Sequence, residues 1–458
     1  MFFQQVLNRD LRCASYLVGD GGEAVVVDPR WDIEPYLEIA REYGLRITHV
    51  IDTHDHADHV SGRARLARAT GARAHRSARR EDPDPDDLAP GDELAVGTIR
   101  IRALWTPGHR PEHLAFVVTD LARTPDPWLV LSGDSLLVGD LARPDLAVDA
   151  RSGAEALHSS LADLLALGDD VEVWPGHIGG SLCGGANLSG KSSSTIGFER
   201  RHNPLLQASR SEFVQGVVAS IPPRPPNVAH IVELNRATTG QGPRDAAQLT
   251  PAGVLELFRG GVTILDARPP QQFDAGHLAG ALNLPVTASG VGSRAGRVVG
   301  PDERILIVAD STRDARAMVS ALQAVGIWGI EGYSVADRAD WHRDGLPVAT
   351  SASWDLAQLA LGLRDREVDL IDVRDASEWR AGHVAGSHHL PLHELGDGRR
   401  VALGDQQRVL AVACAAGARA AFAASLLRRA GRLNVVRIAG GGIADLPRHG
   451  VELTAGAA

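Results

Sequence analysis

The sequence has few cysteines, few aromatic residues and no long apolar run. Three cysteines in 458 residues (Cys13, Cys183 and Cys414) exclude a disulfide scaffold and indicate a reducing compartment. No run of about 18 apolar residues is present, so we expect no membrane span. The start MFFQQVLNRDLRC lacks the features of a signal peptide. These absences predict a cytoplasmic protein with no membrane association.

An excess of basic residues is also missing. Lys and Arg total 47 against 57 Asp and Glu, which gives a net charge of −10. Nucleic-acid-binding proteins need a basic surface, so we expect no nucleic-acid partner. What is present is an ordinary globular composition, 44% apolar and 23% charged. The length corresponds to roughly three domains at about 150 residues each.

The second half of the chain contains an internal repeat. ILDARPPQQFDAGHLAGALNLP at 264–285 matches LIDVRDASEWRAGHVAGSHHLP at 370–391. Each copy continues into an apolar strand and then a helical segment, which predicts two consecutive α/β domains with parallel sheets. We therefore expect three domains, at residues 1–243, 249–350 and 351–458. The Gly-containing segment 238–244 is the predicted linker after the first.

Seven histidine and aspartate side chains follow apolar segments in the first half. THDHADH holds four of them within six residues, and TPGH, LSGD and WPGH each add one. The candidates are His54, His56, Asp58, His59, His109, Asp134 and His177. Imidazole and carboxylate groups are ligands of zinc and iron. Four such side chains in six residues cannot all be buried without a shared cation, so the pattern predicts a metal site.

This motif set, HxHxDH with later GH, GD and GH elements, resembles the metallo-β-lactamase fold over residues 1 to about 235. The resemblance implies an αββα sandwich with the metal at one edge of the sheets. Hydrolases such as glyoxalase II hold two metals with all seven residues. Persulfide dioxygenases hold one iron at the positions matching His54, His109 and Asp134. His56, Asp58, His59 and His177 are then either neighbours of the iron or ligands of a second metal.

The ligands alone leave both alternatives open, because all seven residues are present. RCASYLVGD (12–20) and GDSLLVGDLARPDL (133–146) resemble segments of the dioxygenase family. The second segment ends in Arg143 and Asp145, which can brace the loop under the metal by charge-assisted hydrogen bonds. Two histidines and one carboxylate suit non-haem iron, with positions left open. We expect one Fe(II) per chain, with zinc as the alternative.

The sequence after His177 departs from dioxygenases that use glutathione persulfide. It lacks their His-Asp-Tyr segment, and Leu205 rather than arginine follows the Asn-Pro pair. GSLCG and SSTIGFE resemble instead fused dioxygenase–sulfurtransferase enzymes, some of which act on coenzyme A persulfide. Cys183 is therefore a candidate for the persulfide channel, although an inert buried cysteine is the commoner role.

GANLSGKS at 185–192 formally matches a phosphate-binding P-loop. A P-loop must follow a buried strand and open a helix, and this segment follows a polar, Gly-rich one. We reject that interpretation. Lys191, the single lysine of the chain, is kept as a candidate contact for an anionic group of the substrate.

Cys414 begins the loop CAAGAR between an apolar strand and a helix, and Arg419 ends it. Small residues let the backbone N–H groups turn toward the sulfur, and the helix N-terminus adds positive partial charge. Both stabilise an anionic persulfide. With the upstream DVR, GHVAGS and LP elements, the loop resembles a rhodanese domain with Cys414 and Arg419 as catalytic residues. Asp310 occupies the corresponding position in the first copy and cannot carry sulfur.

The expected fold is thus a metallo-β-lactamase sandwich followed by two rhodanese-like α/β domains. The expected activity is oxidation of a thiol persulfide (glutathione or coenzyme A type) with O₂ to sulfite, coupled to sulfur transfer that makes or uses thiosulfate. One alternative is a dinuclear zinc thiolester hydrolase of glyoxalase II type, and another is a persulfide carrier or sensor. Related enzymes are commonly dimers or tetramers, so we expect a homo-oligomer.

Overall fold

The computed structural model describes residues 1–456 except 186, 223, 225, 238–241, 336–337 and 397–406. The chain forms two compact units: residues 1–242 with 323–326, and residues 243–322 with 327–458. Most of the predicted linker at 238–244, residue 186 of the GANLSGKS segment and the last two residues of the third predicted domain lie outside the described residues. Among the described residues, no helix is long and apolar enough to cross a membrane. The three-domain division stays a prediction.

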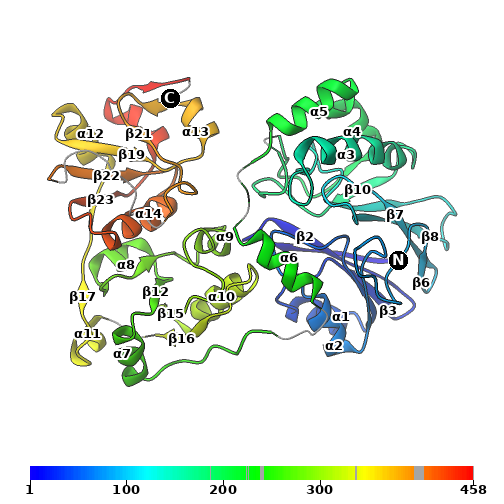
Figure 1. Cartoon of the computed structure of the whole chain (residues 1–458), viewed down its shortest axis with the longest axis horizontal. Coiled ribbons are helices and arrows are strands. Elements are labelled where there is room, and N and C mark those ends of the chain that lie inside the picture. The colour runs from blue at the N-terminus through cyan, green and yellow to red at the C-terminus, as the bar shows by residue number, and fades with distance from the viewer. Residues whose placement is uncertain are drawn as a thin grey trace. The chain divides into compact units, whose positions relative to one another are not determined.

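The first unit contains two mixed sheets (Figure 1). The first has the order β1-β2-β3-β4-β5, with β1 (Phe2–Asn8), β2 (Cys13–Asp20), β3 (Glu23–Val27), β4 (Arg46–Ile51) and β5 (Arg73–His75). The second has the order β11-β10-β9-β8-β7-β6, with β6 (Glu93–Val96), β7 (Ile99–Trp105), β8 (Leu114–Asp120), β9 (Leu129–Gly133), β10 (Glu172–Pro175) and β11 (Ser194–Thr195). Alternate residues of both sheets, such as Tyr16, Val18, Ile101 and Phe116, share one buried cluster, so the sheets pack face to face.

Helices cover the outer face of each sheet. They are α1 (Glu34–Glu42), α2 (Arg63–Thr70), α3 (Ala150–Leu165), α4 (Ile196–His202), η1 (Pro204–Gln207) and α5 (Arg210–Ala219), whereas α6 (Val228–Arg236) packs on loops through Val228, Ala57 and Leu146. Tyr36 of α1 and Leu66 of α2 pack on the first sheet. Leu157 of α3 and Phe213 of α5 pack on the second. The four layers confirm the predicted αββα sandwich.

The second unit contains two parallel sheets, one for each sequence repeat. The first repeat has the order β14-β12-β15-β16, with β12 (Thr263–Asp266), β14 (Leu282–Asn283), β15 (Ile305–Val308) and β16 (Ile330–Ser334), and a ribbon of β13 (His277–Leu278) and β17 (Val348–Ala349). Its helices are α7 (Pro251–Arg259), α8 (Pro270–Ala275), α9 (Val291–Ala295), α10 (Thr312–Gln323) and α11 (Arg338–Arg343).

Read from its opposite edge, the sheet of the second repeat has the same strand order as the first, with one strand added at an edge. The order is β18-β23-β22-β19-β21, with β18 (Ala352–Trp354), β19 (Val368–Asp372), β21 (His388–His389), β22 (Val409–Ala413) and β23 (Val435–Ile438), and a ribbon of β20 (His383–Val384) and β24 (Leu453–Thr454). Its helices are α12 (Leu356–Arg364), α13 (Ala376–Ala381), α14 (Ala418–Arg429) and η2 (Ile443–His449). The α/β class predicted for both repeats is confirmed.

Candidate metal centre and sulfur-transfer loop

The predicted metal ligands lie on loops that follow strands of the first unit. His54 follows β4, His109 follows β7, Asp134 follows β9 and His177 follows β10. All of these strands end at one edge of the sandwich, so residues more than a hundred positions apart meet there. The structure thereby brings all seven predicted histidines and aspartates into one buried region.

Three of the seven side chains point bare polar atoms at one another. Nε2 of His54, Nε2 of His109 and Oδ2 of Asp134 are buried and have no hydrogen-bond partner. The carboxylate oxygen lies 3.4 Å from His109 Nε2 and 3.9 Å from His54 Nε2. Both distances are too long for a good hydrogen bond. Buried polar atoms without partners are costly, so this donor set fits a metal ion.

The other ring nitrogens hold these two histidines in place. His109 Nδ1 lies 2.7 Å from the carbonyl oxygen of Arg143, so it must donate there and Nε2 is the unprotonated nitrogen. His54 Nδ1 lies 2.9 Å from the Thr53 hydroxyl. Burial lowers the pKa of both His54 and His109, which favours the neutral imidazole that a metal requires.

His177 uses both ring nitrogens on carboxylates. Its Nδ1 lies 2.7 Å from Asp134 Oδ1 and its Nε2 lies 3.0 Å from Asp58 Oδ2. Although burial opposes the charge, the two carboxylates hold the pKa of His177 well above its ordinary value. His56 and His59 each turn one nitrogen toward an aspartate, Asp28 and Asp58 respectively, and leave the other unpartnered.

Arg143 lies under this cluster. It forms a bidentate pair with Asp145, at 2.7 and 2.8 Å, and its backbone N–H donates to the carbonyl oxygen of Cys183. Cys183 is buried, close to Asp58 and His177, and burial raises the pKa of its thiol well above the ordinary value. Lys191 is exposed. Within the part of the chain described, no hydrogen bond or ion pair joins its ammonium group to the histidine cluster.

The Cys414 loop lies in the second repeat, between β22 and α14. Cys414 is 3% exposed, and its Sγ accepts a hydrogen bond of 3.0 Å from the Gly417 N–H. Gly417 has φ 94°, a left-handed conformation that favours glycine. Gly442 of the GGG segment backs the loop, where an added Cβ would lie 2.6 Å from the Cys414 carbonyl oxygen. The backbone therefore wraps closely around the sulfur.

Arg419 lies in the first turn of α14 rather than at the end of the loop, because the helix already begins at Ala418. Its guanidinium pairs with both carboxylate oxygens of Glu378 (2.6 and 2.8 Å) and with Asp375 (3.1 Å). Burial opposes its charge, yet the Glu378 carboxylate holds the pKa of Arg419 above its ordinary value. A fixed cation thus lies in the first turn of the helix that follows the cysteine loop.

In the first repeat the corresponding loop is built differently. Asp310 is exposed, and α10 begins two residues after it, whereas α14 begins four residues after Cys414. The Ser311 hydroxyl accepts from the Asp314 N–H and donates to the Asp314 carboxylate. This N-terminal turn is closed by its own side chains and holds no thiol.

The two halves of the chain match different protein families. Residues 8–177 match the metallo-beta-lactamase superfamily, and residues 250–335 and 355–446 each match the rhodanese-like domain. A hydroxyacylglutathione hydrolase of Anaeromyxobacter dehalogenans is 30% identical over 258 residues, covering 51% of this chain and 95% of the relative. The chain belongs to the metallo-beta-lactamase superfamily and carries two rhodanese-like domains.

Two further relatives bear on the metallo-beta-lactamase domain. The human protein named persulfide dioxygenase ETHE1, mitochondrial, is 28% identical over 237 residues, covering 50% of this chain and 85% of that protein. The crystal structure of a metallo-beta-lactamase from Staphylococcus aureus subsp. aureus COL superposes with a TM-score of 0.64 at 29% identity, covering 73% of this chain and 98% of that one. Dioxygenases and hydrolases are thus both among the relatives.

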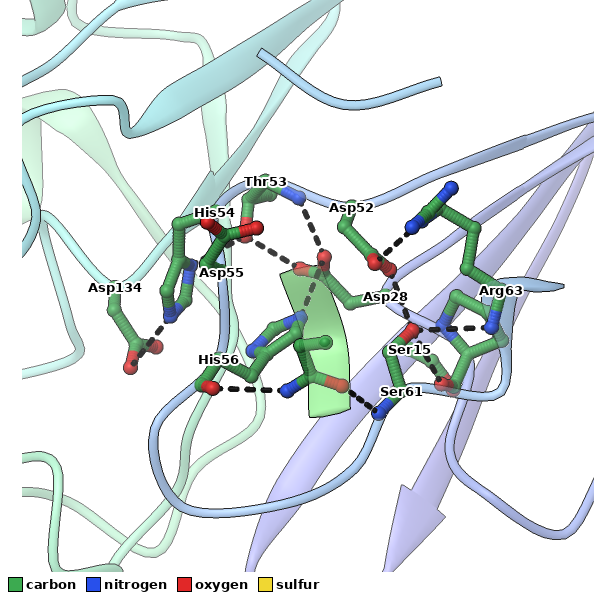
Figure 2. A network of polar contacts seen from close by, with 12 residues as sticks. Ser15, Asp28, Asp52, Thr53, His54, Asp55, His56, Ser61, Arg63 and Asp134 are labelled. Carbon is green, nitrogen blue, oxygen red and sulfur yellow. Dashed lines mark hydrogen bonds and ion pairs between the residues drawn. The ribbon is translucent and has the colours of Figure 1, made fainter. Parts of the chain in front are cut away.

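Two residues that the sequence analysis did not assign support the loop that carries His54, His56 and His59 in the metallo-beta-lactamase domain. Asp28, at the end of β3 with φ 51°, accepts from the backbone N–H and hydroxyl of Thr53 and contacts His56 (Figure 2). Asn235 of α6 donates to the carbonyl oxygens of His56 and His59. Asp28 ends an apolar strand, which is a usable signal, but nothing local to Asn235 marks it.

His113 is another residue that the sequence analysis did not assign, although it lies four positions after His109. Its Nε2 accepts the backbone N–H of Asp134 at 2.9 Å, and its Nδ1 lies 2.8 Å from the Thr106 hydroxyl. The ring thus fixes the backbone of the carboxylate ligand candidate. The second histidine of PGHRPEH is the signal that could have identified it.

Proposed function

We propose that the metallo-beta-lactamase domain is a non-haem iron persulfide dioxygenase and that the last domain is a sulfurtransferase, acting together in sulfide detoxification. The observation that carries the first part is the set of three bare, buried atoms on His54, His109 and Asp134. The reaction converts a thiol persulfide, O₂ and water into the free thiol and sulfite. The persulfide S–S bond breaks, and the outer sulfur is oxidised by the four electrons that O₂ accepts.

The metal in this proposal is one Fe(II), held by His54, His109 and Asp134. Iron in such a set of two histidines and one carboxylate supplies open coordination positions and the redox chemistry. The chain's own contribution is orientation. The Arg143 carbonyl oxygen and the Thr53 hydroxyl fix the two imidazoles, and His113 fixes the Asp134 backbone. Arg143, tied to Asp145, also holds the backbone of Cys183.

The substrate of the dioxygenase is a low-molecular-weight thiol persulfide of the glutathione or coenzyme A type. Cys183 lies beside the metal cluster, which supports its place next to the entering persulfide. Lys191 is exposed, which supports at most a role toward a distant anionic group of the substrate.

At Cys414 the proposed step is sulfur transfer to or from sulfite. The Cys414 persulfide gives its outer sulfur to sulfite, the S–S bond to Sγ breaks, and a new S–S bond forms in thiosulfate. Sγ keeps the bonding electron pair, so it leaves as a thiolate. The Gly417 N–H that points at Sγ supports this role, as does the fixed cation of Arg419.

Iron content and oxygen uptake test the dioxygenase together. We expect one iron per purified chain, and O₂ uptake with a thiol persulfide that matches sulfite formation one to one. Asp134→Ala is expected to abolish both iron retention and uptake, because it removes the carboxylate of the set. Iron-loaded protein that consumes no O₂ would contradict the proposal.

A dinuclear zinc hydrolase of glyoxalase II type is the second candidate. The unpartnered atoms His56 Nδ1 and His59 Nε2 favour it, since they leave donors for another metal. The hydroxyacylglutathione hydrolase relative supports it as well. Two zinc ions per chain with thiolester hydrolysis and no O₂ uptake would establish this function instead.

A further inference from the structure

Two contacts join the first rhodanese-like domain to the second at the elements that flank the Cys414 loop. The loop follows β22, which pairs with β23 in the sheet, and it leads into α14. Both elements are held by side-chain contacts with the domain that lacks the thiol. Both domains belong to the same compact unit. The inference drawn from these contacts rests on the sulfurtransferase proposed above.

The first contact is a buried ion pair. Arg437 of β23 is 3% exposed, and its guanidinium donates to Asp274 Oδ2 of the first domain at 2.6 and 3.1 Å. The Asp274 side chain is itself only 10% exposed. Arg437 also lies against the loop, because its Nη1 is 3.9 Å from the Cβ position at Gly417. A buried guanidinium without an anion is strongly unfavourable, so Asp274 fixes the side chain that backs Gly417.

The second contact holds α14. The backbone N–H of Asn283 in β14 donates to the Ser425 hydroxyl at 3.0 Å, and both residues are buried. The Asn283 side chain is anchored in its own domain by the carbonyl oxygens of Asp266 and Arg268. Every residue of α14 from Ala420 to Leu427 is buried, whereas α10 contains exposed and part-buried positions as well as buried ones. A helix buried all round needs cover on both sides, and β14 supplies one side.

We propose that the first rhodanese-like domain positions the sulfur-transfer loop of the second. Asp274 acts through Arg437 on Gly417, and Asn283 acts through Ser425 on α14, so the N–H group that faces Cys414 is held from both sides. Asp274 and Asn283 are positioning residues, since neither touches the sulfur. The domain without a thiol is thereby part of the transfer machinery.

The experiment compares Asp274→Asn with Asp369→Asn in the full chain. Asp369 pairs with Arg408 (3.2 Å) at the opposite end of the strands from the loop, so it controls for loss of an ion pair alone. Hydrogen exchange at residues 414–418 is expected to be about tenfold faster in Asp274→Asn and unchanged in Asp369→Asn. With thiosulfate as donor and cyanide as acceptor, kcat is expected to fall about tenfold while KM changes less than about twofold. Asp274→Glu is expected to restore most of the lost kcat.

Unchanged exchange at the loop in folded Asp274→Asn overturns the positioning role, and so does a Glu variant as impaired as the Asn variant. If Asp274→Asn does not fold, Ser425→Ala answers the same question with the same two readouts. Exchange is measured without turnover, so the two proposals can fail separately. A wild-type chain that moves no sulfur refutes the sulfurtransferase, whereas an active wild type with an unaffected Asp274→Asn refutes only the positioning role.

Discussion

The two rhodanese-like domains share their frame and differ at the loop where sulfur would bind. In one, Arg268 forms a bidentate pair with Asp266 and donates to the Gly276 carbonyl oxygen. In the other, Arg374 makes the same contacts with Asp372 and the Gly382 carbonyl oxygen. The histidine of each GH element stacks on an aromatic ring, with centroids 3.7 and 3.9 Å apart.

The differences lie in a few residues around the strand end. Cys414 is replaced by Asp310, the loop before the helix is two residues shorter, and Gln272 stands where Glu378 pairs with Arg419. Packing requirements preserve the buried frame in both copies, because each buried polar group there needs its partner. The proposed sulfur transfer depends on one loop, so a domain can lack that loop and keep its fold.

The largest effect is expected from removing the thiol. Cys414→Ser should lower sulfur transfer by about a thousandfold or more, the scale seen when an enzyme loses its nucleophile. Oxygen uptake should be unchanged, and the product should shift from thiosulfate to sulfite. Asp310→Ser, the matched change in the other repeat, should leave the product ratio as it is. The ratio of thiosulfate to sulfite, measured by ion chromatography, decides this, and equal ratios in wild type and Cys414→Ser would refute the division of labour.

The next effect tests the close packing behind the loop. Gly442→Ala places a methyl group against the Ala415 and Cys414 carbonyl oxygens, so the loop must shift. A displacement of this kind costs about 10- to 100-fold in kcat. Gly440→Ala is the comparison: Gly440 has φ 75°, so an alanine there strains the backbone, but its Cβ meets nothing within 4 Å. Gly442 has φ −140°, so its alanine variant introduces the clash without that strain. Equal losses of kcat in the two variants would mean that contact with the loop is not the cause.

A smaller effect is expected from the pair present in only one repeat. Glu378→Gln removes the bidentate partner of Arg419 and should cost about 1–2 kcal/mol of the free energy of unfolding. Burial raises the pKa of Glu378, but the Arg419 pair outweighs it and the net pKa is lowered. The pair therefore stabilises the fold above the ordinary carboxyl pKa, and this is lost as the pH falls through the lowered value.

Urea unfolding between pH 3 and 7 measures this contribution. The difference between wild type and Glu378→Gln should be full at pH 7 and should shrink on acidification. Glu367→Gln, an exposed carboxylate of the same domain, has the same charge change and should show little difference. A difference that grows toward low pH would contradict the assignment.

The smallest effect is expected from restoring a thiol to the first repeat. Asp310→Cys in a Cys414→Ser background should give no measurable sulfur transfer, because α10 begins only two residues later and Ser311 already closes its first turn. Transfer of radiolabelled sulfane sulfur to the protein provides a sensitive readout. Recovery of even a small part of the wild-type rate would show that loop length is not what separates the repeats.

The fold class and most of the candidate site residues could be predicted from the sequence, because the patterns that indicate them are local. Four ligand-type residues within six positions indicate a metal site, and a repeat with constant spacing indicates two copies of one fold. Asn235 and His113 were not assigned because their importance depends on which distant backbone groups they reach. Asn235 is the eighth residue of α6, in an ordinary-looking segment, yet its side chain donates to the loop carbonyl oxygens of His56 and His59, which lie 179 and 176 residues away.

The sequence by itself determined the fold class, the candidate ligands and which of the two repeats carries a cysteine at the loop, because periodicity and residue chemistry are properties of short segments. Only the tertiary structure decided which ring nitrogens are bare, since each histidine's free atom depends on the partner of the other. It also decided that Asp274 and Asn283 of the domain without a thiol hold the elements beside Cys414. Such contacts join residues 142 and 163 positions apart, and only packing brings them together.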